Sequence, residues 1–180
     1  IYEPHPIVNV QIFLTFTIKY VRDLANVDEN VMSVSPQVNK EKRPFIGTVV
    51  ICDNRLYCIP LTSPKPKHEK MKNDKDFSKV YDKHGKLIGC LNFNNMIPVN
   101  NEVIIPIDIK IRPSDSAEDR YYKQLLDNQL DWCNDNIENI IKKANKLYKI
   151  ITETPEKSHN LTKRCCDFKK LEKILENKWS

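Results

Sequence analysis

The first 112 residues carry short apolar segments separated by polar turns. β-Branched and aromatic residues dominate these segments, a pattern typical of β-strands. The predicted strands cover 10–18, a hairpin at 45–61, and 77–81, 87–93, 96–99 and 103–109. A short helix or turn is predicted at 19–25, an ordered loop or a short helix at 26–42, and a loop at 62–76. Because the connections are short, neighbouring strands are expected to pair antiparallel.

The predicted hairpin gives the clearest strand signal in the chain. A two-residue turn at 53–54 would pair Cys52 with Arg55. Cys58 then lies opposite Val49, so the two cysteines are out of register for a disulfide. The first strand of the hairpin is apolar on both sides apart from Thr48, which predicts burial on both of its faces or a strongly bent sheet.

A helical pattern replaces the strand pattern from residue 117 onwards. Apolar residues recur at spacings of three and four over 117–151, which predicts one amphipathic helix, or two that break near 134–136. Ser114 or Ser116 is the predicted N-cap. A last helix is predicted at about 161–178.

Strands first and helices last are typical of an α+β domain. We expect a single domain over residues 1–180, with 11–112 mainly β, 117–178 helical, and 1–10 as an extra N-terminal segment. The expected architecture is a twisted antiparallel sheet with the helices packed against it.

The composition narrows the class of protein. A net charge of +5 and a pI near 8.8 favour a polyanionic partner, although 24 acidic residues require the positive charge to gather on one face. Only 3 glycines are present and the GxxxxGK[ST] spacing is missing, which argues against a P-loop nucleotide hydrolase. No run approaches the roughly 20 apolar residues of a membrane span, so no membrane partner is expected.

Cysteine and histidine spacing argues against a bound metal. The chain has 6 cysteines and 4 histidines, but no CxxC motif and no ligand-like spacing among them. We therefore expect no metal and no cofactor. Reduced, mostly buried thiols in a cytoplasmic protein are favoured over a disulfide scaffold.

The most informative residues follow the second strand of the hairpin. Thr62, Ser63 and Lys65 place two hydroxyls and an ammonium at the exit of a rigid element, and Pro64 limits flexing. Such a set suits a phosphate oxygen. Arg43 precedes the first strand, so the hairpin should bring it to the same end. The alternative is a solvated polyproline-like loop whose hydroxyls bond their own backbone.

These side chains suffice for RNA cleavage without a metal. The ribose 2′-hydroxyl attacks the adjacent phosphorus, a base takes its proton, an acid protonates the leaving oxygen, and a cation offsets the growing negative charge. Lysine, arginine, tyrosine and hydroxyl side chains can fill these roles.

Further residues are expected to contact RNA around this loop. The basic candidates are Lys42, Lys67 and Lys70. The tyrosines that could stack on bases or bond phosphate are Tyr20, Tyr121 and Tyr122. His68 is a candidate RNA contact or acid–base group, with a pKa depressed by neighbouring lysines. The alternatives are a core position for Tyr122, which fits the apolar helical stripe, and ordinary solvated surface for the lysines.

A family resemblance is carried by PFIGTVVICDNRLYCIPLTSPKPKH, by GCLNFNNMIPV and by a tyrosine in YYKQLL. These segments resemble the ToxN/AbiQ family, and within it the CptN branch. Its members are toxin endoribonucleases of bacterial type III toxin–antitoxin systems. The family's Thr-Ser-x-Lys falls on Thr62, Ser63 and Lys65, and its helix tyrosine on Tyr122. Arg43 stands where lysine is usual, which keeps the charge but excludes a neutral amine as base.

The resemblance implies more than the residues show by themselves. It implies a compact, strongly twisted sheet related to the Kid/MazF toxins. It implies metal-independent cleavage that leaves 2′,3′-cyclic phosphate and 5′-hydroxyl ends on cellular and phage RNA. The implied partner is an RNA antitoxin of tandem pseudoknot repeats, held in a closed protein–RNA assembly that covers the active site; no DNA partner is expected. Abortive infection of phage is the implied setting.

Two other readings of the sequence stay open. One is a non-catalytic RNA-binding module with the same basic groove. The other is a helical protein–protein interaction domain built from residues 117–178, which predicts no salt-dependent affinity for RNA.

Overall fold

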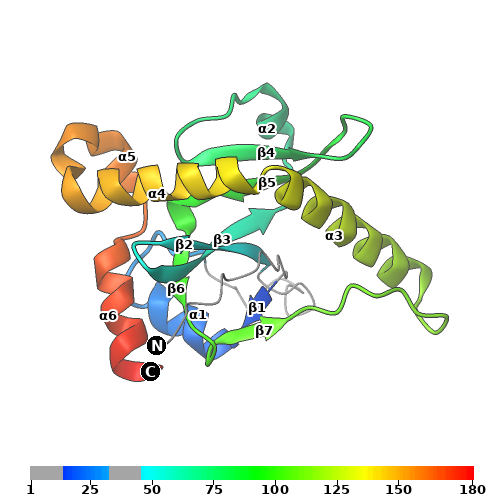
Figure 1. Cartoon of the computed structure of the whole chain (residues 1–180), viewed down its shortest axis with the longest axis horizontal. Helices are drawn as coiled ribbons and strands as arrows, with labels where there is room; N and C mark the ends of the chain where they lie inside the picture. Colours follow the sequence, from blue (N-terminus) through cyan, green and yellow to red (C-terminus); the bar gives the residue numbers. More distant parts are fainter. Residues whose placement is uncertain (1–13, 33–45) are drawn as a thin grey trace, which may run out of the picture.

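The computed structural model describes residues 14–32 and 46–180. Within them, strands form one antiparallel sheet in the order β4-β5-β3-β2-β1-β7, and β6 pairs with β3 off this path (Figure 1). The strands are β1 Leu14–Phe16, β2 Gly47–Cys52, β3 Arg55–Thr62, β4 Phe77–Tyr81, β5 Leu87–Asn92, β6 Ile97–Val99 and β7 Ile104–Pro106. The α-helices are α1 Ile18–Ala25, α2 Pro66–Lys70, α3 Ala117–Asp135, α4 Ile137–Glu153, α5 His159–Arg164 and α6 Phe168–Lys178. The predicted α+β class is confirmed.

β3 is the central strand of the sheet. It pairs with β2 along the hairpin, and the predicted register of Cys52 with Arg55 and of Val49 with Cys58 is confirmed. The turn residues 53–54 both have positive φ, 50° and 60°, as a type I′ turn requires. The first half of β3 also pairs with β6, and its last two residues pair with β5. β3 therefore links the β4–β5 hairpin to the rest of the sheet.

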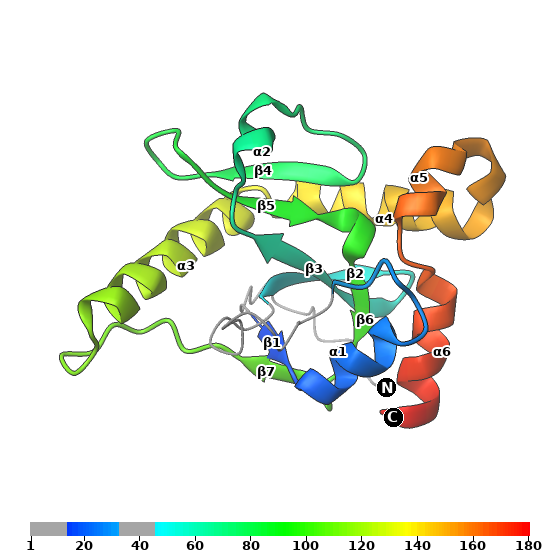
Figure 2. The ribbon, with the colours of Figure 1, turned by 180° about the vertical axis from the view of Figure 1, so that it is seen from behind.

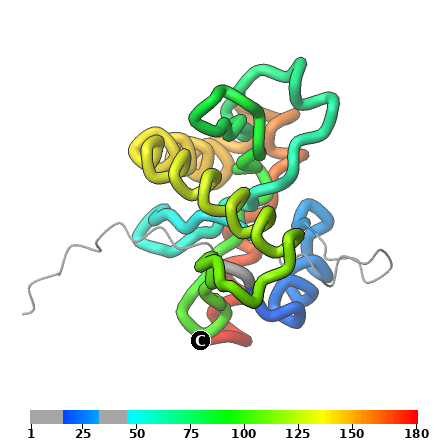
Figure 3. The backbone as a smooth tube through the Cα atoms, turned by 90° about the vertical axis from the view of Figure 1, so that its right-hand side faces the viewer, coloured from blue at the N-terminus to red at the C-terminus, as the bar shows by residue number. Residues whose placement is uncertain are grey.

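The helices cover the sheet from more than one side. α4 packs on β2, α6 packs on β6 and on α4, and α3 packs on β4 and β5. α1 lies on the opposite side of the molecule from α4, which Figures 2 and 3 show from behind and from the side. Phe168 and Leu171 of α6 are buried in the core.

Helix boundaries follow local signals in the sequence. Ser116 is the N-cap of α3, where its hydroxyl accepts from the Asp119 N–H at 3.0 Å, as predicted for one of two serines. Of the two alternatives for 117–151, the structure shows two helices, because α3 and α4 meet at Asn136, within the region 134–136 where a break was expected.

The pairing of the later strands differs from expectation. β6 and β7 are consecutive in sequence but do not pair with each other: β7 pairs with β1, and β6 pairs with β3. A short connection allows two consecutive strands to pair, but it does not require them to. The packing of their apolar side chains decides which strands pair in the folded sheet. β7 also ends at Pro106, earlier than predicted, and proline has no N–H for a ladder bond.

Two helical predictions also need correction. The predicted loop at 62–76 contains α2, a single turn that begins with Pro66 at its first position, where the missing N–H has no helical partner. The predicted last helix is two helices, because the chain breaks at Cys166, whose N–H donates to Asn94 O at 2.8 Å.

Burial of β2 on both faces is wrong. Thr48, Val50 and Cys52 are buried, but Ile51 is 39% exposed and Val49 is half-buried. The strand is covered by the core on one face and is open to solvent towards its end on the other.

Candidate active site at the end of the central hairpin

Thr62 is the last residue of β3 and is anchored on both sides. It pairs with Cys90 of β5, and the residue before it, Leu61, donates its N–H to Ile46 O at 2.8 Å. The Asn92 side chain donates from Nδ2 to Thr62 Oγ1 at 2.9 Å. The hydroxyl oxygen of Thr62 is therefore an acceptor inside the protein, which leaves its proton free to point elsewhere.

Lys65 lies three residues further on and caps α2. Its backbone N–H donates to His68 Nδ1 at 3.0 Å, and its carbonyl accepts from the His68 N–H at 2.8 Å. The side chains of Ser63 and Lys65 are exposed, and neither has a hydrogen bond or ion pair with residues 14–32 or 46–180. The backbone of the loop is held, while its hydroxyl and ammonium groups face solvent.

His68 lies beneath this loop. It is only 6% exposed, its Nδ1 is 3.3 Å from Cys90 Sγ, and its ring centroid is 5.4 Å from that of Phe77. Burial lowers the pKa of His68 below its usual range, and the charges of nearby lysines lower it further, as predicted. The expectation that His68 contacts RNA directly is wrong, because a buried imidazole bonded to backbone does not present its ring to a ligand.

Tyr122 joins the site through an apolar cluster. It is half-buried on α3 and packs against Ile46 and Leu126, as do Leu61 and Ile107. Leu61 directly precedes Thr62, so the cluster connects the α3 face that carries Tyr122 to the base of the loop. Tyr122 thus packs in a small core beside the candidate site, as its place in the apolar stripe predicted, and its contact with a nucleotide stays a prediction.

The neighbouring tyrosines have different positions. Tyr121 is 69% exposed on α3 and is available to an external partner. Tyr20 is fully buried, its hydroxyl donates to Pro98 O, and its ring meets Trp179 at 5.6 Å between centroids. The RNA contact predicted for Tyr20 is therefore wrong: burial raises its pKa, and the residue belongs to the core.

The positive charge of the chain is concentrated next to the loop. Residues 65–86 contain eight lysines and four acidic residues, which is most of the net excess of +5. Arg164 pairs with two of those acids, Asp76 at 2.6 Å and Asp74 at 3.6 Å, so they offset little of the lysine charge. Lys67 and Lys70 are exposed on α2. This basic segment can attract an RNA backbone. Arg43 and Lys42 lie outside the described residues.

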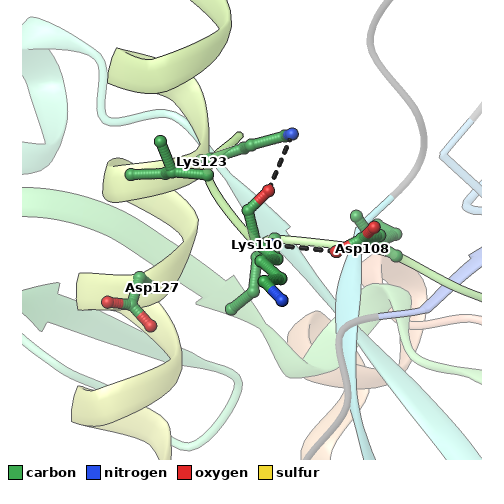
Figure 4. A pocket seen from close by; sticks show the side chains of 7 residues that line it. Asp108, Lys110, Lys123 and Asp127 are labelled. Carbon is green, nitrogen blue, oxygen red and sulfur yellow. Dashed lines mark hydrogen bonds between the residues drawn. The ribbon is translucent and has the colours of Figure 1, made fainter. Parts of the chain in front are cut away.

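A separate pocket of about 500 Å³ lies between α3 and the segment 107–111 (Figure 4). Lys123 points across it and donates to Lys110 O at 2.9 Å and to Asp115 at 2.8 Å, and the Lys110 N–H donates to Asp108 (Figure 4). The Lys123 ammonium is thus paired with a carboxylate, unlike that of Lys65, and Asp108 and Asp127 add negative charge to the lining. The pocket is a weaker site for a polyanion than the loop.

Asn92 is the site residue that the sequence did not reveal. It ends an apolar strand two positions after the buried Cys90, so both side chains point to the same face of β5. A polar residue two positions after a buried one, on the same face of a strand, was the signal in the sequence that could have pointed to Asn92. Its partner, however, is fixed by the pairing of β5 with β3, which local sequence does not specify.

Among the described residues, no group of three or more His, Cys, Asp and Glu side chains could hold a metal ion. The six cysteines are free and buried, as the sequence predicted for its thiols. None of the helices seen in 14–32 and 46–180 has the length and apolar character to span a membrane.

Comparison with known protein families gives a match over most of the chain. The family described as "Toxin ToxN, type III toxin-antitoxin system" matches residues 12–176. The endoribonuclease ToxN of Bacillus thuringiensis subsp. kurstaki is 33% identical over 171 residues, which cover 89% of this chain and 80% of that protein. The endoribonuclease ToxN of Pectobacterium atrosepticum is 26% identical over 144 residues, covering 78% and 81%.

Solved structures show the same fold. A toxin from a study of selective toxin inhibition by a non-coding RNA pseudoknot superposes with a TM-score of 0.76 at 29% identity, covering 92% of this chain and 96% of that one. AbiQ, a lactococcal anti-phage endoribonuclease, superposes with a TM-score of 0.72 at 24% identity, with the same two coverages. The second likeness shows the fold alone. The first agrees with the family resemblance carried by the hairpin and loop segments.

Proposed function

Because the chain belongs to the ToxN family of toxins of type III toxin–antitoxin systems, we propose that it is an endoribonuclease. The observation that carries the proposal is the loop after β3. Thr62, Ser63 and Lys65 form the Thr-Ser-x-Lys set, on a backbone fixed by hydrogen bonds and with Lys65 unpaired among residues 14–32 and 46–180. An exposed ammonium beside two hydroxyls, next to a basic segment, suits the phosphodiester of RNA.

The proposed reaction needs no metal. The 2′-oxygen of the ribose forms a bond to the adjacent phosphorus as the bond to the 5′-oxygen breaks in line. The 2′-proton passes to a base and the 5′-oxygen takes a proton from an acid, which gives 2′,3′-cyclic phosphate and 5′-hydroxyl ends. Lys65 offsets the charge that grows on the phosphate and is the proton-transfer candidate, while Thr62 and Ser63 donate hydrogen bonds that position it.

Other residues complete the proposed site. Arg43 supplies a second positive charge, and its guanidinium, which stays protonated, cannot act as the base. Tyr122 borders the nucleotide from α3. Lys42, Lys67, Lys70 and Tyr121 extend the contact with RNA beyond the cleaved bond.

We also propose how the activity is controlled. One similar structure comes from a study of toxin inhibition by a non-coding RNA pseudoknot. We infer that a pseudoknot RNA, cut from a repeat transcript, covers the Thr62–Lys65 loop in a closed protein–RNA assembly. The targets are cellular and phage RNA in the cytoplasm, where buried free thiols such as those of this chain persist.

The test is cleavage of RNA by purified protein in EDTA, with the fragment ends analysed chemically. We expect fragments with 2′,3′-cyclic phosphate and 5′-hydroxyl ends. The Lys65→Ala protein, prepared in parallel, controls for contaminating nucleases. A mobility shift without fragments would instead support a non-catalytic RNA-binding module. Fragments with 5′-phosphate ends, or activity only with added metal, would contradict the proposed chemistry.

A further inference from the structure

One face of β5 lies directly beneath both ends of the Thr62–Lys65 loop. Cys90 and Asn92 point to this face, two residues apart. Asn92 contacts Thr62 at one end of the loop, and Cys90 contacts His68, which holds Lys65 at the other end. We propose that Asn92 and His68 are positioning residues that hold Thr62 and Lys65 in the geometry needed for RNA cleavage. The inference rests on the proposed nuclease function.

The contact at Asn92 sets the direction of the Thr62 hydroxyl. Asn92 Nδ2 is 2.9 Å from Thr62 Oγ1 and 3.5 Å from the carbonyl oxygen of Cys90. A carbonyl can only accept, so the amide turns its nitrogen, and not its oxygen, to this side. Thr62 Oγ1 then accepts from the amide. Its own proton points away from Asn92, where it can be donated to a phosphate oxygen.

The contact at His68 sets the backbone of Lys65. The Lys65 N–H donates to Nδ1, so Nδ1 carries no proton and the neutral ring carries its proton on Nε2. The Lys65 carbonyl accepts from the His68 N–H in return. Both polar backbone groups of Lys65 are thus fixed by one residue, while its ammonium stays exposed. The Cys90 thiol, on β5, also contacts His68 Nδ1.

The position of these contacts gives them a catalytic consequence. In-line attack depends on the placement of the reacting atoms, and a misplacement of about 1 Å can reduce a rate by about 100-fold. Neither Asn92 nor His68 presents an exposed group to RNA in the way that Lys65 does. Their effect must therefore pass through the loop, and this separates them from catalytic residues.

A pair of substitutions separates positioning from acid–base catalysis at His68. Asparagine can place an oxygen near the position of Nδ1, whereas glutamine places its terminal group near Nε2. We expect His68→Asn to cleave RNA within a few-fold of the wild type, and His68→Gln and His68→Ala to be about 10- to 100-fold slower. The pH profile of His68→Asn should keep both limbs of the wild-type profile. Thermal unfolding of each variant shows whether it is folded.

The matching test at Asn92 reverses the polarity of its side chain. Aspartate has the same shape but only accepts, so the Thr62 hydroxyl would turn inward and donate to it. We expect Asn92→Asp to lower kcat by at least as much as Asn92→Ala. Combining Asn92→Ala with Thr62→Val should add almost nothing to the loss from Thr62→Val alone, because both act through one hydroxyl. Fully additive losses would contradict the proposal.

The outcomes also separate this inference from the proposed function. If the wild type cleaves RNA and folded His68→Ala cleaves at the same rate, or His68→Asn is as slow as His68→Ala, the positioning role of His68 fails alone. If the wild type cleaves no RNA, the proposed function fails and the positioning role fails with it. Nitrogen NMR of the imidazole is an independent check, since a proton on Nδ1 would contradict the Lys65 hydrogen bond whatever the activity.

Discussion

The two ends of β3 differ in whether the charged side chains near them have partners. Its first residue, Arg55, belongs to a cluster around Glu172 of α6, in which the charged groups have partners. Its last residue, Thr62, leads into a loop where the Lys65 ammonium has no partner among residues 14–32 and 46–180. One strand thus joins a cluster of paired charges at its first residue to a loop with an unpaired lysine at its last, about seven residues apart in sequence.

At the paired end, Glu172 is buried and both of its carboxylate oxygens have partners. Glu172 is 4% exposed, and its Oε1 accepts from the hydroxyls of Tyr57 at 2.8 Å and Tyr148 at 2.7 Å. Lys169 approaches its Oε2 at 3.3 Å, and Arg55 approaches it at 3.7 Å. Burial raises the pKa of Tyr148 to about 12, and raises the pKa of Tyr57 as well, so both phenols stay protonated as donors.

The difference shows which of the two ends contributes its polar contacts to the stability of the fold. A buried carboxylate is tolerated only when its lone pairs are filled, so every group around Glu172 serves the fold. An exposed lysine costs little in stability and stays available to a ligand. Substitutions at the two ends should therefore separate cleanly into effects on activity and effects on folding.

The largest expected effect is loss of activity in Lys65→Ala. Removing a cation that stabilises the transition state should slow cleavage by about 100- to 1,000-fold, or about 2.7–4 kcal/mol of barrier. The free energy of unfolding should change by less than about 0.5 kcal/mol, because the side chain is exposed. Growth inhibition measures the loss of activity, and chemical denaturation measures the free energy of unfolding. A toxic and stable Lys65→Ala protein would contradict the comparison.

The next effect is loss of stability in Glu172→Ala. The buried phenol of Tyr57 loses its acceptor, at about 1–3 kcal/mol for an unsatisfied group, whereas Tyr148 keeps a long hydrogen bond to Asp53 at 3.4 Å, so we expect a total of about 2–3 kcal/mol. Glu176→Ala is the matched control, since it lies on the same helix and pairs with the same Arg55 but is half exposed. That variant should lose less than about 1 kcal/mol. Equal losses in the two variants would show that burial does not distinguish them.

Removing a single hydrogen bond from the cluster around Glu172 should reduce the stability by a smaller amount. Tyr57→Phe removes one donor to Glu172 but keeps the ring, which meets Tyr148 and Phe168 edge to face at 5.6 and 5.7 Å. We expect a loss of about 1 kcal/mol in urea denaturation and an unchanged rate of RNA cleavage. A change in cleavage rate would mean that the two ends of β3 are coupled.

The sequence predicted the parts of this comparison that are local. The hairpin, its register and the Thr-Ser-x-Lys loop were visible because a two-residue turn fixes both strands. α2 was missed because its one turn is held by Pro66 and His68 and has no apolar period. Burial was the main source of error. Tyr20 and His68 carry polar groups that suggest RNA contact, yet their partners, Pro98 and Cys90, are more than 20 residues away.

The smallest expected effect is a loss of stability in mild acid that depends on His68. Burial, and then the charges of Lys67, Lys65 and Lys79, lower its pKa below the ordinary value of 6.5. The facing thiol of Cys90 stays neutral, because burial raises its pKa to about 11. As the pH falls below about 6.5, the unfolded chain binds a proton at this histidine before the folded chain does. The stabilisation is therefore complete above that pH and declines below it.

The variant His68→Asn isolates this effect, since asparagine does not titrate. The free energy of unfolding of the wild type, minus that of the variant, should be constant between pH 7 and 8 and should fall as the pH is lowered to 5. A difference that stays constant or rises in acid would mean that His68 accepts a proton at least as readily in the folded protein as in the unfolded chain. The bond from the Lys65 N–H to a neutral Nδ1 would then add no stability to the folded protein, and the support proposed for the loop after β3 would fail.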